Sequence, residues 1–238
     1  MLSRLSRLLF VFGLLFSLFL LLPPVLGQPF GPYPLVANAD VFDLLTPVVL
    51  LPLYWLLFRL RPDHYPGSRG TLYFMALAGA WAMGQGMHLA ANSIGHLVTA
   101  PAQSDLARVT HFYDEDLSHF IWHGAIIGLM VLLLARQWRL PFAPADGPVA
   151  GRAQVLVGAL LYGLTFGLAV LEAGTAVLGV PAAVGVVGFW LGRGRGRLDR
   201  QPLLRFFVTA MGAAVLLFAV WFVIYGGLPE PSAVGLIE

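Results

Sequence analysis

Cysteine and lysine are both absent from this chain, and charged residues are scarce. Without cysteine the chain forms no disulfide bond and offers neither a thiolate metal ligand nor a cysteine nucleophile. Charged residues make up 11% of the 238 residues, whereas soluble domains carry about 25%. No basic stripe interleaved with aromatic residues appears, so we expect no nucleic-acid partner.

Apolar sequence fills most of the chain instead. Hydrophobic residues make up 58% of it, and the mean hydropathy is +0.81. A helix needs about 20 mainly apolar residues to cross a bilayer core about 30 Å thick. We therefore predict an all-α polytopic membrane protein, a single integral membrane domain over residues 1–238, built as a bundle of about seven transmembrane helices. The seven stretches are 6–26, 42–60, 71–99, 110–135, 154–172, 175–192 and 205–226.

The first stretch and the arginines set the expected orientation. Residues 1–27 fit either an uncleaved first helix, which we favour, or a cleaved signal peptide, which would leave six helices. All fourteen basic residues are arginines, and only Arg108 falls on the opposite side of the seven-span chain from the rest. Because basic residues accumulate on the cytoplasmic side, we expect a plasma or inner membrane protein with its N-terminus inside and its C-terminus outside.

Five of the six histidines lie between residues 88 and 123. At about 100° per residue, positions i, i+4 and i+8 of a helix share a sector about 80° wide. The third and fourth predicted spans are consecutive and antiparallel, so their polar sectors can face each other across one interface near the outer membrane face. The third span contributes His88, Asn92 and His96, and the fourth contributes Asp116, His119 and His123.

This constellation predicts a metal site. Ionisable groups on a membrane helix are costly unless they pair, line water or face a protein interior. Two histidines at i, i+4 present their nitrogens to one ion, and a third from a neighbouring helix completes a three-ligand zinc site. We prefer His88, His119 and His123 as ligands, with either His96 or Asp116 as a fourth.

The expected chemistry is hydrolysis of a lipid or lipid-like amide or ester. Zinc lowers the pKa of a bound water to about 7 and so makes hydroxide available as a nucleophile. Asp116 or Glu115 would take up the proton, and Asn92 would orient a carbonyl or stabilise an oxyanion. Asp43 lies either at the outer rim, which we favour, or points into the same cavity.

Seven spans with a His/Asp metal site resemble, in architecture, the alkaline ceramidase and adiponectin-receptor superfamily. That family places its HxxxH pair on the last helix. Here the pair is His119 and His123 on the fourth predicted span, and the last span holds no histidine. The resemblance therefore covers the architecture only, and no residue roles are carried over from it.

Three other interpretations stay open at this point. Histidines at matched depth on neighbouring helices also ligate haem, or copper or iron together with Asp116, which would make the protein a redox protein. Protonatable histidines could serve a metal or proton transporter or a sensor. Against transport, the inner parts of the two spans, 76–82 and 126–134, are almost wholly apolar. A polar zipper between the helices would need no ligand at all.

Overall fold

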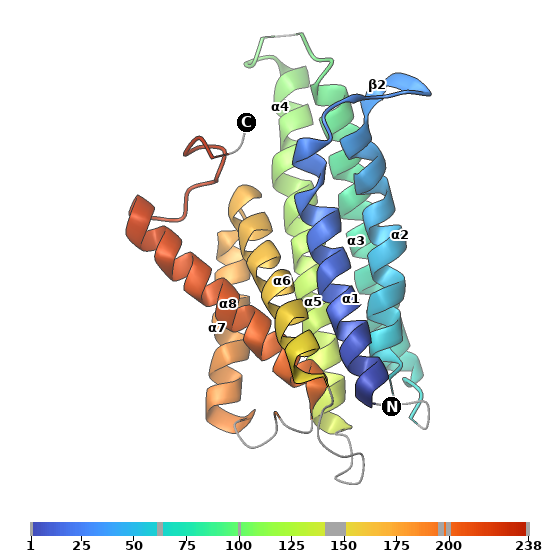
Figure 1. The fold of residues 1–238 in the computed structure, drawn as a ribbon. Helices are drawn as coiled ribbons and strands as arrows, with labels where there is room; N and C mark the ends of the chain where they lie inside the picture. Colours follow the sequence, from blue (N-terminus) through green and yellow to red (C-terminus); the bar gives the residue numbers. More distant parts are fainter. Residues whose placement is uncertain are drawn as a thin grey trace.

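The computed structural model describes residues 2–60, 64–99, 101–140, 151–194, 198 and 201–236. Nearly all regular structure in these residues is helical, and the helices pack as a bundle (Figure 1). A short antiparallel hairpin of β1 (Pro29–Phe30) and β2 (Tyr33–Ala37) lies at one end of the bundle. The predicted all-α bundle is therefore observed.

The helices follow one another along the chain with short connections. The fourth predicted span lies within one helical segment, Asp105–Arg139, which contains a π-helical turn at Phe112–Leu117. The helical elements are α1 (Leu2–Leu21), η1 (Pro23–Val25), α2 (Asn38–Phe58), α3 (Ser68–Gly95), α4 (Asp105–His111), η2 (Phe112–Leu117), α5 (Ser118–Arg139), α6 (Arg152–Glu172), α7 (Ala176–Phe189), η4 (Trp190–Gly194) and α8 (Pro202–Tyr225).

Six helical segments among the described residues are long and apolar enough to cross a membrane. The third predicted span forms α3, which has 28 residues but is not one of the six. The helix is long enough to cross a membrane, but its hydropathy is lower because its second half carries Gln85, His88 and Asn92. Six spans are thus supported by length and composition, and the predicted count of seven is not.

Aromatic side chains from distant helices form the centre of the bundle. Phe12 on α1 packs edge-on against Tyr54 on α2, with ring centroids 4.8 Å apart, and Phe16 stacks on Tyr162 of α6 at 4.0 Å. The hydroxyl groups of Tyr54 and Tyr162 are hydrogen-bonded at 2.8 Å, so the only polar atoms of these two rings satisfy each other in the core. The first predicted stretch is therefore an integral part of the packed core.

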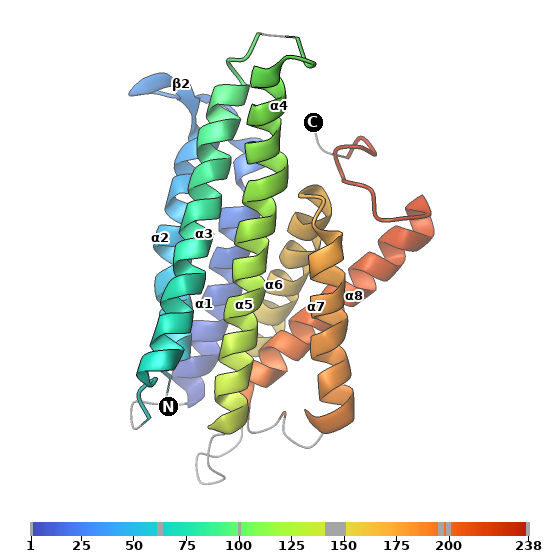
Figure 2. The ribbon, with the colours of Figure 1, turned by 180° about the vertical axis from the view of Figure 1, so that it is seen from behind.

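The contact between α3 and α5 positions the histidines. The two helices lie side by side in both views (Figures 1 and 2). At Gly84 a Cβ atom would lie 2.9 Å from the Ser118 carbonyl oxygen and 2.9 Å from the backbone nitrogen of Trp122. Only a residue without a side chain allows the two backbones to approach this closely. Gly84 precedes His88 by one turn, so this close approach of the two backbones lies beside a cluster of polar side chains. We call it the polar cluster, and it consists of His88, Asp114, Glu115, His119 and His123.

Candidate metal centre

His88 on α3 contacts Asp114 in the π-helical turn η2. Its Nδ1 atom lies 2.8 Å from Oδ1 of Asp114 and 3.4 Å from the Asp114 carbonyl oxygen. The contact with Oδ1 is at ion-pair distance, since this carboxylate oxygen makes no hydrogen bond with any described residue. Since both neighbours of Nδ1 are acceptors, Nδ1 carries the ring proton, and Nε2 is left with its lone pair.

The π-helical turn explains why the contacting carboxylate is Asp114 and not the predicted Asp116. A π turn contains an additional residue, because its hydrogen bonds join i and i+5. The prediction assumed 100° per residue throughout, and this assumption fails across Phe112–Leu117. Asp116 is exposed, and the carboxylates that contact histidines in the described part of the chain are Asp114 and Glu115. The assignment of Asp116 to the cluster is corrected accordingly.

His119 lies next to His88 across the helix interface, and the two ring centroids are 4.8 Å apart. Its Nδ1 atom faces Oε2 of Glu115 at 3.6 Å, within ion-pair distance but beyond a hydrogen bond. Glu115 is half exposed, whereas the His119 side chain is almost completely buried. Glu115, which was predicted as a proton acceptor, therefore lies beside His119 at the protein surface.

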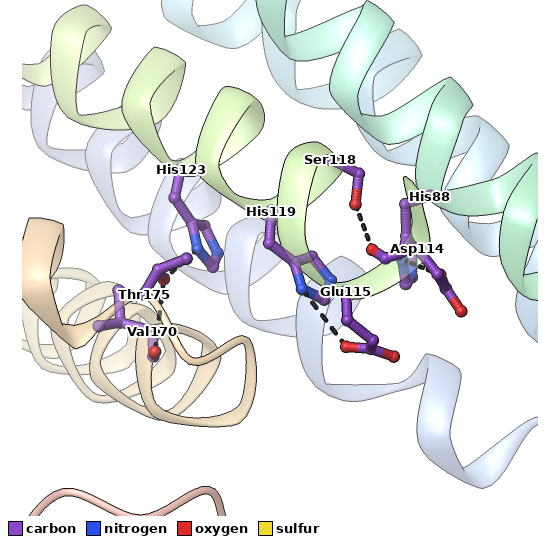
Figure 3. Close-up of polar contacts among 8 residues, drawn as sticks. All are labelled: His88, Asp114, Glu115, Ser118, His119, His123, Val170 and Thr175. Atoms are coloured by element: carbon purple, nitrogen blue, oxygen red, sulfur yellow. Dashed lines mark hydrogen bonds and ion pairs between the residues drawn. The ribbon is translucent and has the colours of Figure 1, made fainter. Parts of the chain in front are cut away.

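His123 is the most deeply buried of the three histidines, with 1% of its surface exposed. Its Nδ1 atom lies 2.6 Å from the hydroxyl oxygen of Thr175, which follows the α6–α7 turn. Its Nε2 atom is buried and has no hydrogen-bond partner among the described residues. Figure 3 shows the resulting row, with Asp114 facing His88, Glu115 facing His119 and Thr175 facing His123.

Trp122 forms an apolar wall of the cluster. Its ring stacks on His123 at a centroid distance of 4.9 Å and lies 5.8 Å from His119 and 6.1 Å from His88. Trp122 is 7% exposed, so the imidazoles contact a largely buried aromatic ring. Polar interactions strengthen in such an environment because the local dielectric constant is low.

A second acidic side chain approaches the cluster from α2. Asp43 is buried, and its Oδ1 atom accepts a hydrogen bond of 3.2 Å from Nε2 of Gln85. The Gln85 oxygen in turn accepts a hydrogen bond of 3.3 Å from the Trp81 indole. Asp43 is close enough to interact electrostatically with His88. Of the two placements left open for Asp43, the structure therefore shows the inward one and not the favoured rim, because the packing of α2 against α3 turns its side chain inward.

Two predicted site residues lie further along α3. His96 is exposed at the C-terminal end of the helix, about 12 Å along the axis from His88 at 1.5 Å per residue. The structure therefore does not bring this predicted fourth ligand into the cluster. Asn92 is half-buried one turn beyond His88.

The spacing of the imidazoles can be compared with that of a zinc site. Two imidazoles bound tetrahedrally at about 2.0–2.1 Å have ring centroids about 5 Å apart. The His88–His119 separation of 4.8 Å matches this value, whereas His119 and His123 are 6.1 Å apart. Among the described residues, no three His, Asp or Glu side chains already form a group that could hold a metal ion.

An apolar groove of about 370 Å³ lies between the second half of α3 and α4. Met87 and Tyr113 are among its lining residues, and each directly precedes a member of the cluster, His88 and Asp114 respectively. Successive residues of an α-helix point about 100° apart, so the groove lies on a neighbouring face of these helices, and no histidine is among the described residues that line it.

No protein family model, no curated protein and no solved structure matches this chain. Its function is therefore inferred from geometry alone.

Proposed function

We propose that this protein is a metal-dependent membrane enzyme, with zinc as its metal, that hydrolyses an amide or ester bond of a lipid or lipid-like substrate. The observation that carries the proposal is the shared orientation of three buried imidazoles. Each directs Nδ1 toward an oxygen of Asp114, Glu115 or Thr175. In metal-bound histidines one ring nitrogen donates to such an oxygen and the other binds the metal. His88 and His123 have a hydrogen bond of this kind, and His119 has the longer contact of 3.6 Å.

A polar zipper accounts less well for the same residues. In a zipper, interhelical hydrogen bonds satisfy the buried polar atoms. Here Nε2 of His123 and Nε1 of Trp122 are buried without a partner among the described residues. Each such atom destabilises the protein by about 1–3 kcal/mol. This exceeds the stabilisation of about 0.6 kcal/mol from one interhelical hydrogen bond. A ligand that binds Nε2 of His123 removes one of these penalties.

In this proposal His88, His119 and His123 hold the metal through their Nε2 atoms. His119 and His123 would draw together by roughly 1 Å to reach tetrahedral zinc spacing. Zinc supplies a bound water with a lowered pKa. Glu115 would take up the proton of that water, because it is next to His119 and half exposed, and Asn92, one turn beyond His88, would supply an amide to a developing oxyanion. The groove beside Met87 accommodates the apolar part of the substrate.

Copper or iron redox chemistry is the second candidate, and Trp122 favours it. An indole stacked against three imidazoles is suited to electron transfer to or from a redox metal bound at them. Haem is less suitable, since axial imidazoles on opposite faces of a haem have centroids more than about 6 Å apart, whereas His88 and His119 are 4.8 Å apart.

The proposed topology has seven spans, with α3 as the seventh, the N-terminus inside and the C-terminus outside. Arg59 follows α2, and Arg136 and Arg139 end α5, so these ends lie on the inner side. Helix α4, which contains Arg108, lies at the opposite end of the bundle, the end that also carries the hairpin (Figure 1). Tight packing of α1 in the core supports an uncleaved first helix. Arg61, Arg195, Arg197 and Arg200 lie outside the described residues.

Metal analysis and absorption spectroscopy of the purified full chain in detergent test the proposal. We expect bound zinc without colour, and loss of that zinc in His88→Ala, His119→Ala and His123→Ala. His111→Ala and His96→Ala are matched controls, because both residues are exposed, and they should retain the metal. Coloured protein containing copper or iron would favour the redox candidate. Folded wild-type protein without any metal, even after dialysis against zinc, would contradict both.

Hydrolysis is tested separately. The zinc-loaded protein is incubated with total membrane lipid, and released fatty acids are measured by mass spectrometry against the His119→Ala variant. Release by both proteins alike, or by neither, would contradict the hydrolase assignment while leaving the metal site to its own test.

A further inference from the structure

Thr175 occupies a turn whose backbone geometry is fixed. Gly174 has a positive φ of 61°, a conformation that side-chain-bearing residues rarely adopt. The Thr175 amide donates to the Val170 carbonyl oxygen at 3.0 Å, which closes the end of α6. Thr175 is completely buried and stands at the N-cap position of α7. The turn therefore delivers one hydroxyl group to a defined point beside α5.

This hydroxyl group does not perform the local task that its position predicts. A threonine at an N-cap normally accepts a hydrogen bond from a backbone amide in the first turn of its helix. The Thr175 side chain makes no such bond with α7. Its hydroxyl instead donates to the Val170 carbonyl oxygen at 3.4 Å and lies 2.6 Å from Nδ1 of His123. The Thr175 side chain therefore does not cap α7, and its hydroxyl contacts His123 instead.

The direction of the hydroxyl proton determines the tautomer of His123. When the hydroxyl donates to the Val170 carbonyl oxygen, which can only accept, its oxygen lone pairs face Nδ1 of His123. A lone pair can only accept there, so Nδ1 carries the imidazole proton. Nε2 then carries the ring lone pair, and this is the buried atom that lacks a partner among the described residues.

We infer that Thr175 is a positioning residue, which holds His123 as the Nδ1-protonated tautomer and so presents Nε2 to the metal. Its relation to the metal rests on the proposed function, whereas the tautomer does not. Asp114 does the same for His88 from a different element. Two of the three imidazoles are thus oriented by groups on segments distant in the sequence, and one of these groups is uncharged.

Two substitutions separate this role from a purely structural one. Thr175→Ser keeps the hydroxyl, and Thr175→Val keeps the shape without it. Nitrogen-15 NMR of histidine-labelled full chain, recorded without metal and above the usual pKa of histidine, reports the tautomer. The His123 signal is assigned by its loss in His123→Gln. We expect the Nδ1–H tautomer in the wild type and in Thr175→Ser, and a mixture of tautomers in Thr175→Val.

Zinc affinity is the second measurement. Thr175→Val should lower it about 10- to 100-fold, as loss of such outer partners typically does, and Thr175→Ser should restore most of it. An Nε2–H tautomer in the wild type, or no tautomer change in a folded Thr175→Val, would overturn the inference. A tautomer change in a protein that binds no zinc at all would uphold the positioning role of Thr175 and reject the proposed function instead.

Discussion

Replacing Gly84 with alanine should push α3 away from α5 and weaken the contact between His88 and Asp114. The new Cβ atom would lie 2.9 Å from the Ser118 carbonyl oxygen and 3.0 Å from Trp122 Cβ. Carbon atoms pack best at about 3.5–4.0 Å, so the helices must separate locally by roughly 0.5–1 Å. The ion-pair distance of 2.8 Å between His88 and Asp114 would then lengthen by a similar amount, and the attraction would weaken.

Gly86→Ala is the matched control for this prediction. Gly86 lies two residues further along α3 and is exposed, and a Cβ atom added there would meet no other atom within 4 Å. Both substitutions gain the same helix propensity, about 1 kcal/mol, so this gain cancels in the comparison. Overpacking typically costs about 1–3 kcal/mol. Gly84→Ala should therefore be less stable than Gly86→Ala by about that amount.

The assay combines thermal unfolding in detergent with zinc titration of the folded protein. Gly84→Ala should unfold several degrees below Gly86→Ala, at roughly 2–4 °C per kcal/mol for a chain of this size, and should bind zinc more weakly. Equal midpoints and equal zinc affinities of the two variants would refute the reasoning, because they would show that the close approach at Gly84 does not hold the histidines together.

Two further predictions concern other contacts. Asp114→Asn should lower zinc affinity by about 10- to 100-fold, whereas Asp116→Asn, which changes an exposed carboxylate of the same turn, should leave a zinc titration unchanged; equal losses in both would return Asp116 to the site. Tyr54→Phe should destabilise the protein by about 1–3 kcal/mol, because it leaves the buried Tyr162 hydroxyl without its partner at 2.8 Å. In thermal unfolding, adding Tyr162→Phe should then cost less than Tyr162→Phe alone, and additive losses would contradict that contact.

Helical periodicity was sufficient to group His88, His119 and His123, although not to choose the carboxylate. The spacing of His119 and His123 places them on one face of α5 whatever surrounds the helix. The same counting fails for Asp114 and Asp116, because both lie within the π turn Phe112–Leu117. Three adjacent acidic residues before a histidine pair offer no sequence pattern that locates such a turn.

The remaining members of the cluster depend on contacts between segments far apart in the chain. Asp43 meets Gln85 across 42 residues, and His123 meets Thr175 across 52. Neither Asp43 nor Thr175 differs from an ordinary helix-end residue in the sequence. Their roles arise from the side on which α2 and the α6–α7 turn pack, and this depends on the fit of many side chains at once.

The sequence by itself determined that the chain is a helical membrane bundle and that histidines gather on adjoining helices, because apolar length and helical period are local properties of the chain. Only the tertiary structure decided which oxygens face those histidines, and therefore which ring nitrogen each of them leaves free. That choice depends on differences of about an ångström in how helices approach, at Gly84 above all, and no pattern along the chain records distances between its separate segments.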